Sequence, residues 1–151
     1  MSVRPSVGRS VRPSLLLLLA ACSHLDVEPA VDRITTPIAT PSWSADIAPV
    51  LRETCGSSGA CHGGPTPQVN LLLEGPDATM YTRIVNVAAA YRPSMMLIRP
   101  GQPDSSFLLR IMNEDPAVRF GNRRMPLTQL PMPQPVQQTI RNWIQNGAAQ
   151  N

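Results

Sequence analysis

Apolar residues recur at intervals of three and four in separate stretches of the chain, which is the spacing of one face of an α-helix. The four faces are Ile47, Val50 and Leu51; Met80, Tyr81, Ile84, Val85 and Ala88; Phe107, Leu108, Ile111 and Met112; and Val136, Ile140, Trp143 and Ile144. We find no strand-like alternation of apolar and polar residues. The sequence therefore predicts an all-α fold of about four helices joined by long loops.

Polar and glycine residues suggest where these helices begin and end. The first helix is expected to run from about Ser44 to Cys55. Asp77 is expected to cap the second, and Asp104 or Ser105 the third. Gly147 is typical of a residue that closes the last helix. Between the last two helices the sequence contains Pro116, Pro126, Pro131, Pro133 and Pro135, which predict an irregular loop.

The first 21 residues are typical of an export signal, with arginines at the start and an apolar run from Leu15 to Ala21 that is too short to span a bilayer. Leu19-Ala20-Ala21-Cys22 resembles the lipobox of bacterial lipoproteins, which implies cleavage before Cys22 and lipidation of that cysteine. The alternative is an ordinary cleavable signal that leaves Cys22 free. Both place the mature chain outside the cytoplasm. The lipobox implies a membrane anchor on the periplasmic side of the cell envelope, and Ser23 suits sorting to the outer membrane.

Composition divides the rest of the chain into two parts. Residues 22–42 are rich in Pro, Ala, Thr and Asp without any period, so they predict a flexible tether that contains His24. Residues 43–149 form one predicted domain. Aromatic residues are only 4% of the chain, and four short helices bury little area, so a bound apolar cofactor is expected at the domain's centre.

The charge of the chain argues against nucleic acid as a partner. The formal net charge is +3, and all thirteen basic residues are arginines. Arg4, Arg9 and Arg12 lie in the predicted signal, and from Cys22 onward ten arginines face ten acidic residues. The mature chain is therefore close to neutral and has no basic run to bind phosphates.

The stretch TCGSSGACHGG, residues 54–64, contains Cys55, Cys61 and His62. Two cysteines with a histidine directly after the second are the attachment signature of c-type haem, but that signature has two residues between the cysteines, and here there are five. Gly56 and Gly59 would allow the extra residues to bulge outward.

A methionine could supply a second ligand to a haem iron. Pro126 favours an extended conformation for Met125, within a stretch that cannot be helical. Met132, between Pro131 and Pro133, is the competitor for this role. The remaining candidates lie on helical faces or in apolar runs, where packing is the commoner role; they are Met80, Met95, Met96 and Met112.

Several segments occur together in an order that resembles the small cytochrome c-like domains of exported bacterial proteins. They lie between Ser44 and Ala148 and are IAPVLRETC, CHGG, PGQPDSSFLLRIM, the Met-Pro pair and IRNWIQNGA. The resemblance implies haem c joined through thioethers to Cys55 and Cys61, iron ligated by His62 and Met125, and Trp143 near the haem. It implies a one-electron carrier that serves redox partner proteins, with no catalytic residue and no small-molecule substrate. The five-residue cysteine spacing departs from the family pattern.

Other readings of the same residues are weaker but remain open. Without haem, Cys55 and Cys61 would form a disulfide in an oxidising compartment, and the protein would be a structural or binding lipoprotein. Zinc usually requires four ligands, and the domain offers these two cysteines and His62 besides carboxylates. Thioredoxin-type chemistry requires closely spaced cysteines after a strand, and a hydrolase requires a base beside a nucleophile. Neither pattern is found.

Overall fold

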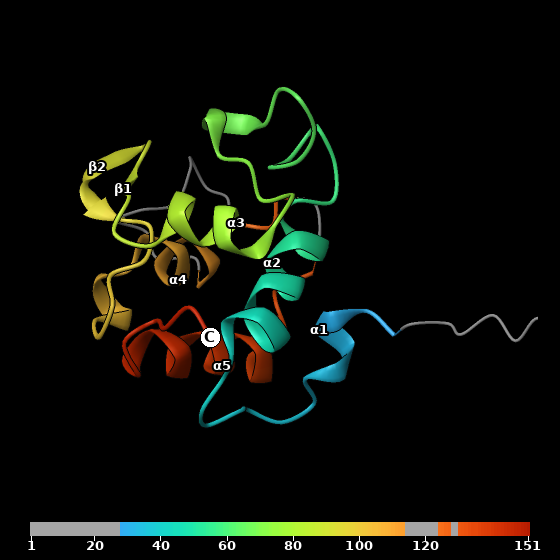
Figure 1. The fold of residues 1–151 in the computed structure, drawn as a ribbon, viewed down its shortest axis with the longest axis vertical. Helices are drawn as coiled ribbons and strands as arrows, with labels where there is room; N and C mark the ends of the chain where they lie inside the picture. The colour runs from blue at the N-terminus through green and yellow to red at the C-terminus, as the bar shows by residue number, and fades with distance from the viewer. Residues whose placement is uncertain (1–27, 114–123, 128–129) are drawn as a thin grey trace, which may run out of the picture.

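The computed structural model describes residues 28–113, 124–127 and 130–151 (Figure 1). Within these residues helices dominate and one small hairpin is present. The helices are α1 (Ala30–Arg33), α2 (Ala48–Thr54), α3 (Asp77–Ile84), α4 (Phe107–Met112) and α5 (Gln134–Gln145). Three short turns join them: a π-helical turn η1 (Trp43–Ile47) and two 3-10 turns, η2 (Gln68–Asn70) and η3 (Pro103–Ser105). In Figure 1 α5 lies at the bottom, α2 rises from it, and the loop between α2 and α3 arcs over the top.

The prediction of an all-α fold is wrong, because β1 (Ala88–Ala89) and β2 (Arg92–Met96) form an antiparallel hairpin. Ala88 pairs with Met96, and Ala89 pairs with Arg92. The hairpin lacks a periodic signal because β1 is only two residues long and β2 is almost entirely exposed. Pro93 is tolerated in such an edge position. The fold is therefore mixed, with helices and a two-stranded sheet.

The first predicted helix is confirmed, as η1 followed directly by α2. Ser42 caps it: the Ser42 Oγ accepts a hydrogen bond of 3.4 Å from the Ala45 N–H, and the Ser42 N–H donates to the Asp46 carboxylate at 2.7 Å. These bonds satisfy donors that the first helical turn leaves without partners. The helix ends with Cys55 as its C-terminal cap, so it delivers this cysteine at a fixed position.

The other three predicted helices are also present, with different caps at two of them. Asp77 is the first residue of α3 rather than its cap, and α3 ends at Ile84, so Ala88 belongs to the hairpin instead. Asp104 and Ser105 form η3, and Ser106 precedes α4. Gly147 follows α5 with a φ of 96°, a conformation that favours glycine, as predicted.

The main core is built around three aromatic rings from distant parts of the sequence. Trp43 stacks on Trp143 with ring centroids 5.4 Å apart, and Tyr81 meets Trp43 edge-on at 5.5 Å. The polar atoms of all three side chains donate to backbone carbonyls, at Asp77, Ala149 and Ala148 respectively. Aliphatic residues of α2, α3 and α5 surround the rings. Large aromatic surfaces are thus buried without leaving their donors unpaired.

Residues 28–42, in the stretch predicted as a tether, are packed onto the domain. Ala30 and Ile34 are buried in the main core. The Ile38 N–H donates to Thr139 Oγ1 at 3.0 Å, and the Asn142 side chain donates to the Ile38 carbonyl at 2.8 Å. These contacts hold the segment along α5. The predicted signal peptide, Cys22 and His24 lie outside the described residues, and no helix inside them has the length and apolar character needed to cross a bilayer.

Candidate functional site

A cavity of about 800 Å³ lies between the loop that follows α2, the end of α3, the hairpin, α4 and the segment around Met125. Its volume is in the upper part of the range of roughly 300–1,000 Å³ that is usual for cofactor and ligand sites. The walls are mostly aliphatic, aromatic and methionine side chains. Cys55, Cys61, His62 and Met125 all line it. Four residues predicted to act together are therefore brought to one cavity.

The cysteine turn, residues 55–64, closes on itself although five residues separate its two cysteines. The His62 N–H donates to the Cys55 carbonyl at 3.0 Å, which brings the two ends of the insertion together. Within the insertion the Ser58 carbonyl accepts hydrogen bonds of 3.0 Å from the N–H groups of both Cys61 and Gly63. The residues between the cysteines thus form a hydrogen-bonded turn. The backbone at Cys55 is held beside the backbone at His62.

Two glycines of the turn are required because backbone atoms approach them closely. A Cβ atom on Gly56 would lie 2.3 Å from the Leu73 carbonyl oxygen, and one on Gly63 would lie 2.2 Å from the Gly56 carbonyl oxygen. Real Cβ contacts are never this short. The Leu73 N–H also donates to the His62 carbonyl at 2.7 Å. The sequence identifies these glycines as turn residues, but it does not reveal these close approaches of backbone atoms.

The His62 imidazole is oriented by a backbone carbonyl. Its Nδ1 lies 3.3 Å from the carbonyl oxygen of Gln68, in η2. Burial lowers the pKa of His62, while backbone hydrogen bonds at Gln68 and Leu71 partly oppose this shift. A neutral ring that donates from Nδ1 keeps the lone pair of Nε2 for a metal, and such second-sphere bonding is usual for histidine ligands.

The turn that carries the Gln68 carbonyl has an unusual backbone. Val69 has a φ of 51° and Asn70 a φ of 55°. A β-branched residue rarely adopts this left-handed conformation, whereas asparagine tolerates it. The strain is held by the hydrogen bonds from Gln68 N–H to Cys61 and from Leu73 N–H to His62. Side-chain motifs gave no signal for Gln68, because its contribution comes from the backbone.

Cys55 and Cys61 are both free, partly buried thiols, and their surroundings differ. Cys55 packs against the main core, and its sulfur lies 3.5 Å from Thr54 Oγ1. Burial raises the pKa of the Cys55 thiol; the hydrogen bond with Thr54 lowers it, and the charge of Cys61 raises it. Cys61 receives a hydrogen bond of 3.4 Å from Ser58 Oγ. The two thiols are near enough to influence each other electrostatically.

Met125 approaches the cavity from a different part of the chain than the cysteine turn. Its N–H donates to the Ile111 carbonyl at 3.1 Å, and its side chain packs against the small cluster of Ala89, Phe107 and Ile111. Met132 also lines the cavity, but it is only 4% exposed and belongs to the main core. Met112, assigned to packing, reaches the cavity as well while remaining in the core. The choice between Met125 and Met132 stays a prediction.

The cavity suits the cofactor that the sequence predicts. A covalently bound haem requires a largely apolar pocket, two thiols and ligands for its iron. The lining of this cavity is mostly apolar and includes two cysteines, a histidine and methionines. For zinc the outcome differs. Within the described ranges, no group of three or more His, Cys, Asp or Glu side chains is placed to hold a metal ion.

Other residues near the site depart from expectation. Trp143 is not among the described residues that line the cavity, since it stacks on Trp43 in the main core. Arg83 and Arg92 do line it, although neither is a site candidate from the sequence. Arg83 occupies a polar position of a helical face and Arg92 lies in the unforeseen hairpin, so only the tertiary fold brings them here.

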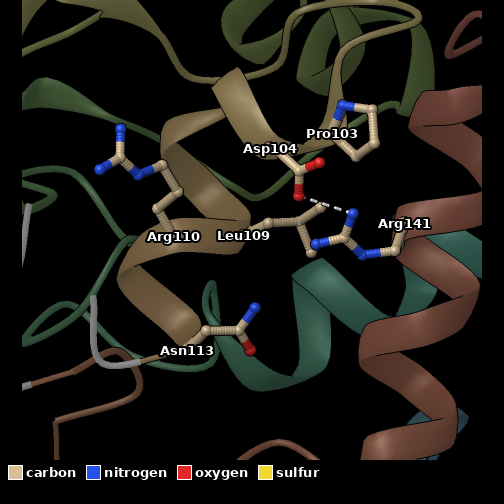
Figure 2. Close-up of a pocket in the computed structure, with 6 residues that line it drawn as sticks. All are labelled: Pro103, Asp104, Leu109, Arg110, Asn113 and Arg141. Carbon is tan, nitrogen blue, oxygen red and sulfur yellow. Dashed lines mark ion pairs between the residues drawn. The ribbon is translucent and has the colours of Figure 1, made fainter.

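A second, smaller cavity of about 340 Å³ lies between η3, α4 and α5 (Figure 2). Asp104 and Arg141 form an ion pair of 2.8 Å across it, and Arg110 points away from that pair. Asp104 is largely exposed, so the pair contributes little stability and is screened by solvent. The described residues that line this cavity include no cysteine and no histidine. The ion pair joins η3 to α5.

Comparison of the chain with models of protein families, with curated proteins and with solved structures finds no match.

Proposed function

We propose that the protein is a c-type cytochrome that transfers single electrons through a covalently bound haem. One observation carries the proposal: Cys55, Cys61, His62 and Met125, which are separated by up to seventy residues in the sequence, line the same apolar cavity of about 800 Å³. A bound haem would supply the one-electron couple of its iron.

Each residue has a defined task in this proposal. Cys61 and Cys55 form thioethers to the porphyrin, and the backbone bond from His62 to Cys55 supports the second attachment despite the five-residue spacing. His62 provides Nε2 to the iron while Nδ1 bonds the Gln68 carbonyl. Met125, which also lines the cavity, would provide its sulfur as the second ligand. A His/Met pair raises the reduction potential relative to two imidazoles.

The proposed protein is a carrier rather than an enzyme. With His62 and Met125 both bound to iron, no coordination position is left for a substrate. Electrons would pass to redox partner proteins in transient encounters. Because the chain from Cys22 onward has equal numbers of arginines and acidic residues, electrostatic steering of these encounters is expected to be weak. The lipobox-like segment supports a lipoprotein anchored through Cys22 on the periplasmic side of the envelope.

The test is the spectrum and mass of the exported full-length protein. The cytochrome should be red, should keep its haem after denaturation, and should exceed the mass of the lipidated polypeptide by one haem. Cys61→Ser and Cys55→Ser should each weaken attachment, whereas loss of attachment in Cys61→Ser alone would show a single thioether at Cys61. Met125→Ala should keep the haem but remove the sulfur-to-iron absorption band and lower the potential. Loss of that band in Met132→Ala instead would assign the distal ligand to Met132.

A colourless protein would contradict the proposal. If it also contained a Cys55–Cys61 disulfide, the rival function of a haem-free structural or binding lipoprotein would be supported. Non-reducing peptide mapping detects that bond directly. Alkylation of both cysteines in the purified wild-type protein without reductant would exclude it.

A further inference from the structure

The charged side chains that line the large cavity are all of one sign. Arg83 of α3 and Arg92 of β2 line it, and no aspartate or glutamate is among its described lining residues. A mostly apolar cavity with two cations and no carboxylate is complementary to an apolar ligand that carries negative charge.

Neither guanidinium is neutralised by a carboxylate of the described residues. Elsewhere in the described chain, Arg52 is paired with Asp77 and Arg141 with Asp104. No ion pair is found for Arg83 or Arg92 within the described residues. Two unpaired cations at the wall of an apolar cavity are costly unless an anion or water accompanies them.

Arg83 is also held in place. Its Nη1 donates to the carbonyl oxygens of Leu72 and Glu74, both at 3.1 Å. These are the only hydrogen bonds of the Arg83 side chain in the described structure. The Nε and Nη2 donors are therefore not used by the described protein. An arginine anchored through one nitrogen can present the other two to a carboxylate in a fork geometry.

Arg92 differs in being more exposed and less constrained. It lies beside the turn of the hairpin, and the only described hydrogen bond of its side chain runs from Nη1 to the carbonyl of its neighbour Tyr91, at 3.1 Å. It can therefore adjust to a ligand without breaking contacts that hold the fold. The Arg83 side chain is therefore a fixed cation, and the Arg92 side chain is an adaptable one.

We propose that Arg83 and Arg92 bind the carboxylates of the cavity's ligand, so that the site selects an apolar dicarboxylate such as a porphyrin with two free propionates. This assignment rests on the proposed function and deepens it, because it adds two cofactor-binding residues outside the cysteine turn. Charge-assisted hydrogen bonds from arginine to carboxylate are among the stronger polar interactions in proteins.

The test compares two porphyrins that differ only at their two carboxyl groups, which are charged in one and neutral methyl esters in the other. The full-length apoprotein is titrated with iron protoporphyrin and with its dimethyl ester, and uptake is followed by absorbance and by quenching of tryptophan fluorescence. The wild-type chain should prefer the free acid by at least about tenfold, which corresponds to roughly 1.4 kcal/mol. Arg83→Gln and Arg92→Gln should each reduce this preference.

Controls separate charge recognition from folding. Arg99→Gln removes the same charge from an exposed arginine that does not line the cavity, and it should keep the wild-type preference. Arg83→Gln also removes the bonds to Leu72 and Glu74 and could loosen the fold, whereas Arg92→Gln loses only a bond to its neighbour. Arg92→Gln therefore keeps the test decisive if Arg83→Gln fails to fold.

Two results would overturn the assignment. If both variants take up porphyrin with the wild-type preference for the free acid, Arg83 and Arg92 do not bind the carboxylates, and the proposed function stands without them. If the wild-type chain takes up neither porphyrin, the proposed function fails and this assignment fails with it.

Discussion

The aromatic core and the large cavity are two apolar regions of the same small domain, and they are closed in different ways. The aromatic core contains Trp43, Tyr81 and Trp143, which contact one another and satisfy their own donors. The cavity has apolar walls, but its rim includes Tyr91 at 47% exposure and Leu127 at 45%. The elements therefore pack on one another without a gap in one region, while in the other they leave a cavity open at its rim.

This difference corrects one argument from the sequence. The scarcity of aromatic residues suggested that a cofactor must fill the centre of the helical domain. Instead, two of the few aromatic residues, Trp43 and Trp143, stack at the centre, and the cavity lies to one side of it. We therefore expect the domain to fold around its aromatic core before any cofactor is bound.

The largest expected effect is on stability, in the aromatic core. Trp143→Ala should lower the free energy of unfolding by about 3–5 kcal/mol, because it removes a fully buried ring that stacks on Trp43. The loss should be similar with and without haem, since Trp143 does not line the cavity. Urea denaturation followed by circular dichroism measures both forms.

A matched change at the cavity rim shows whether the two regions really differ. Leu127→Ala removes an apolar side chain that is 45% exposed, and the apoprotein should lose at most about 0.5 kcal/mol. If Leu127→Ala destabilised the apoprotein as much as Trp143→Ala, the claim that the core folds independently of the cavity would fail.

Met132 and Met125 sharpen the comparison, because both line the cavity but only Met132 belongs to the main core. Met132→Ala should destabilise the apoprotein by about 2–3 kcal/mol, as expected for a methionine that is 4% exposed. Met125→Ala should cost the apoprotein about 1 kcal/mol or less, because its side chain is only partly buried. Equal losses in thermal unfolding of the two apoproteins would contradict this division.

The closed cysteine turn is the third place to test, since it forms one wall of the cavity from backbone contacts. Gly63→Ala should cost about 1–3 kcal/mol, because the new Cβ would lie 2.2 Å from the Gly56 carbonyl oxygen and 2.4 Å from the Glu74 carboxylate. Chemical denaturation gives the stability, and haem bound per polypeptide reports the shape of the wall; both should fall.

Gly59→Ala is the control within the same turn. Its Cβ would meet nothing closer than the Gly63 carbonyl oxygen at 3.9 Å, so stability and haem content should remain near the wild-type values. If Gly59→Ala and Gly63→Ala behaved alike, the close approach would not be what shapes this wall.

Much of the fold is predictable from local pattern. The faces containing Val50, Ile84, Ile111 and Ile140 repeat at helical spacing, and the structure has a helix at each of them. The hairpin has no signal in the sequence because β1 is only two residues long, β2 is mostly exposed, and Ala88 continues an apparent helical face. After Ile84 the chain leaves the helix and enters the hairpin, and the spacing of apolar residues does not indicate this change of backbone conformation.

The candidate site was predictable only where a side-chain motif exists. Cys61 and His62 are adjacent, and Met125 is marked by Pro126, so sequence alone suggested them. Gln68 acts through a backbone carbonyl, and the cavity position of Arg83 depends on how α3 packs. Such contributions arise from tertiary contacts between distant segments, and single positions in the sequence do not reveal them.

The smallest expected effect concerns the two cysteines, because Cys55 packs against the main core and lines the cavity, whereas Cys61 sits beside the exposed residues Gly59 and Ala60. In the apoprotein, iodoacetamide should modify Cys61 several-fold faster than Cys55, as measured by mass spectrometry on the variants Cys55→Ser and Cys61→Ser.

Burial raises the pKa of Cys55 above the ordinary value of 9.0, so the folded chain keeps this proton at a pH where the unfolded chain loses it. The stability that comes from this buried thiol is therefore complete below pH 9.0 and is lost as the pH rises through the folded value. Because the thiolate is the nucleophile, the Cys55 rate should still be rising above pH 9.0. Equal rates for the two cysteines at every pH would show that the core does not protect Cys55. Cys55 would then belong to the cavity alone and not to the aromatic core.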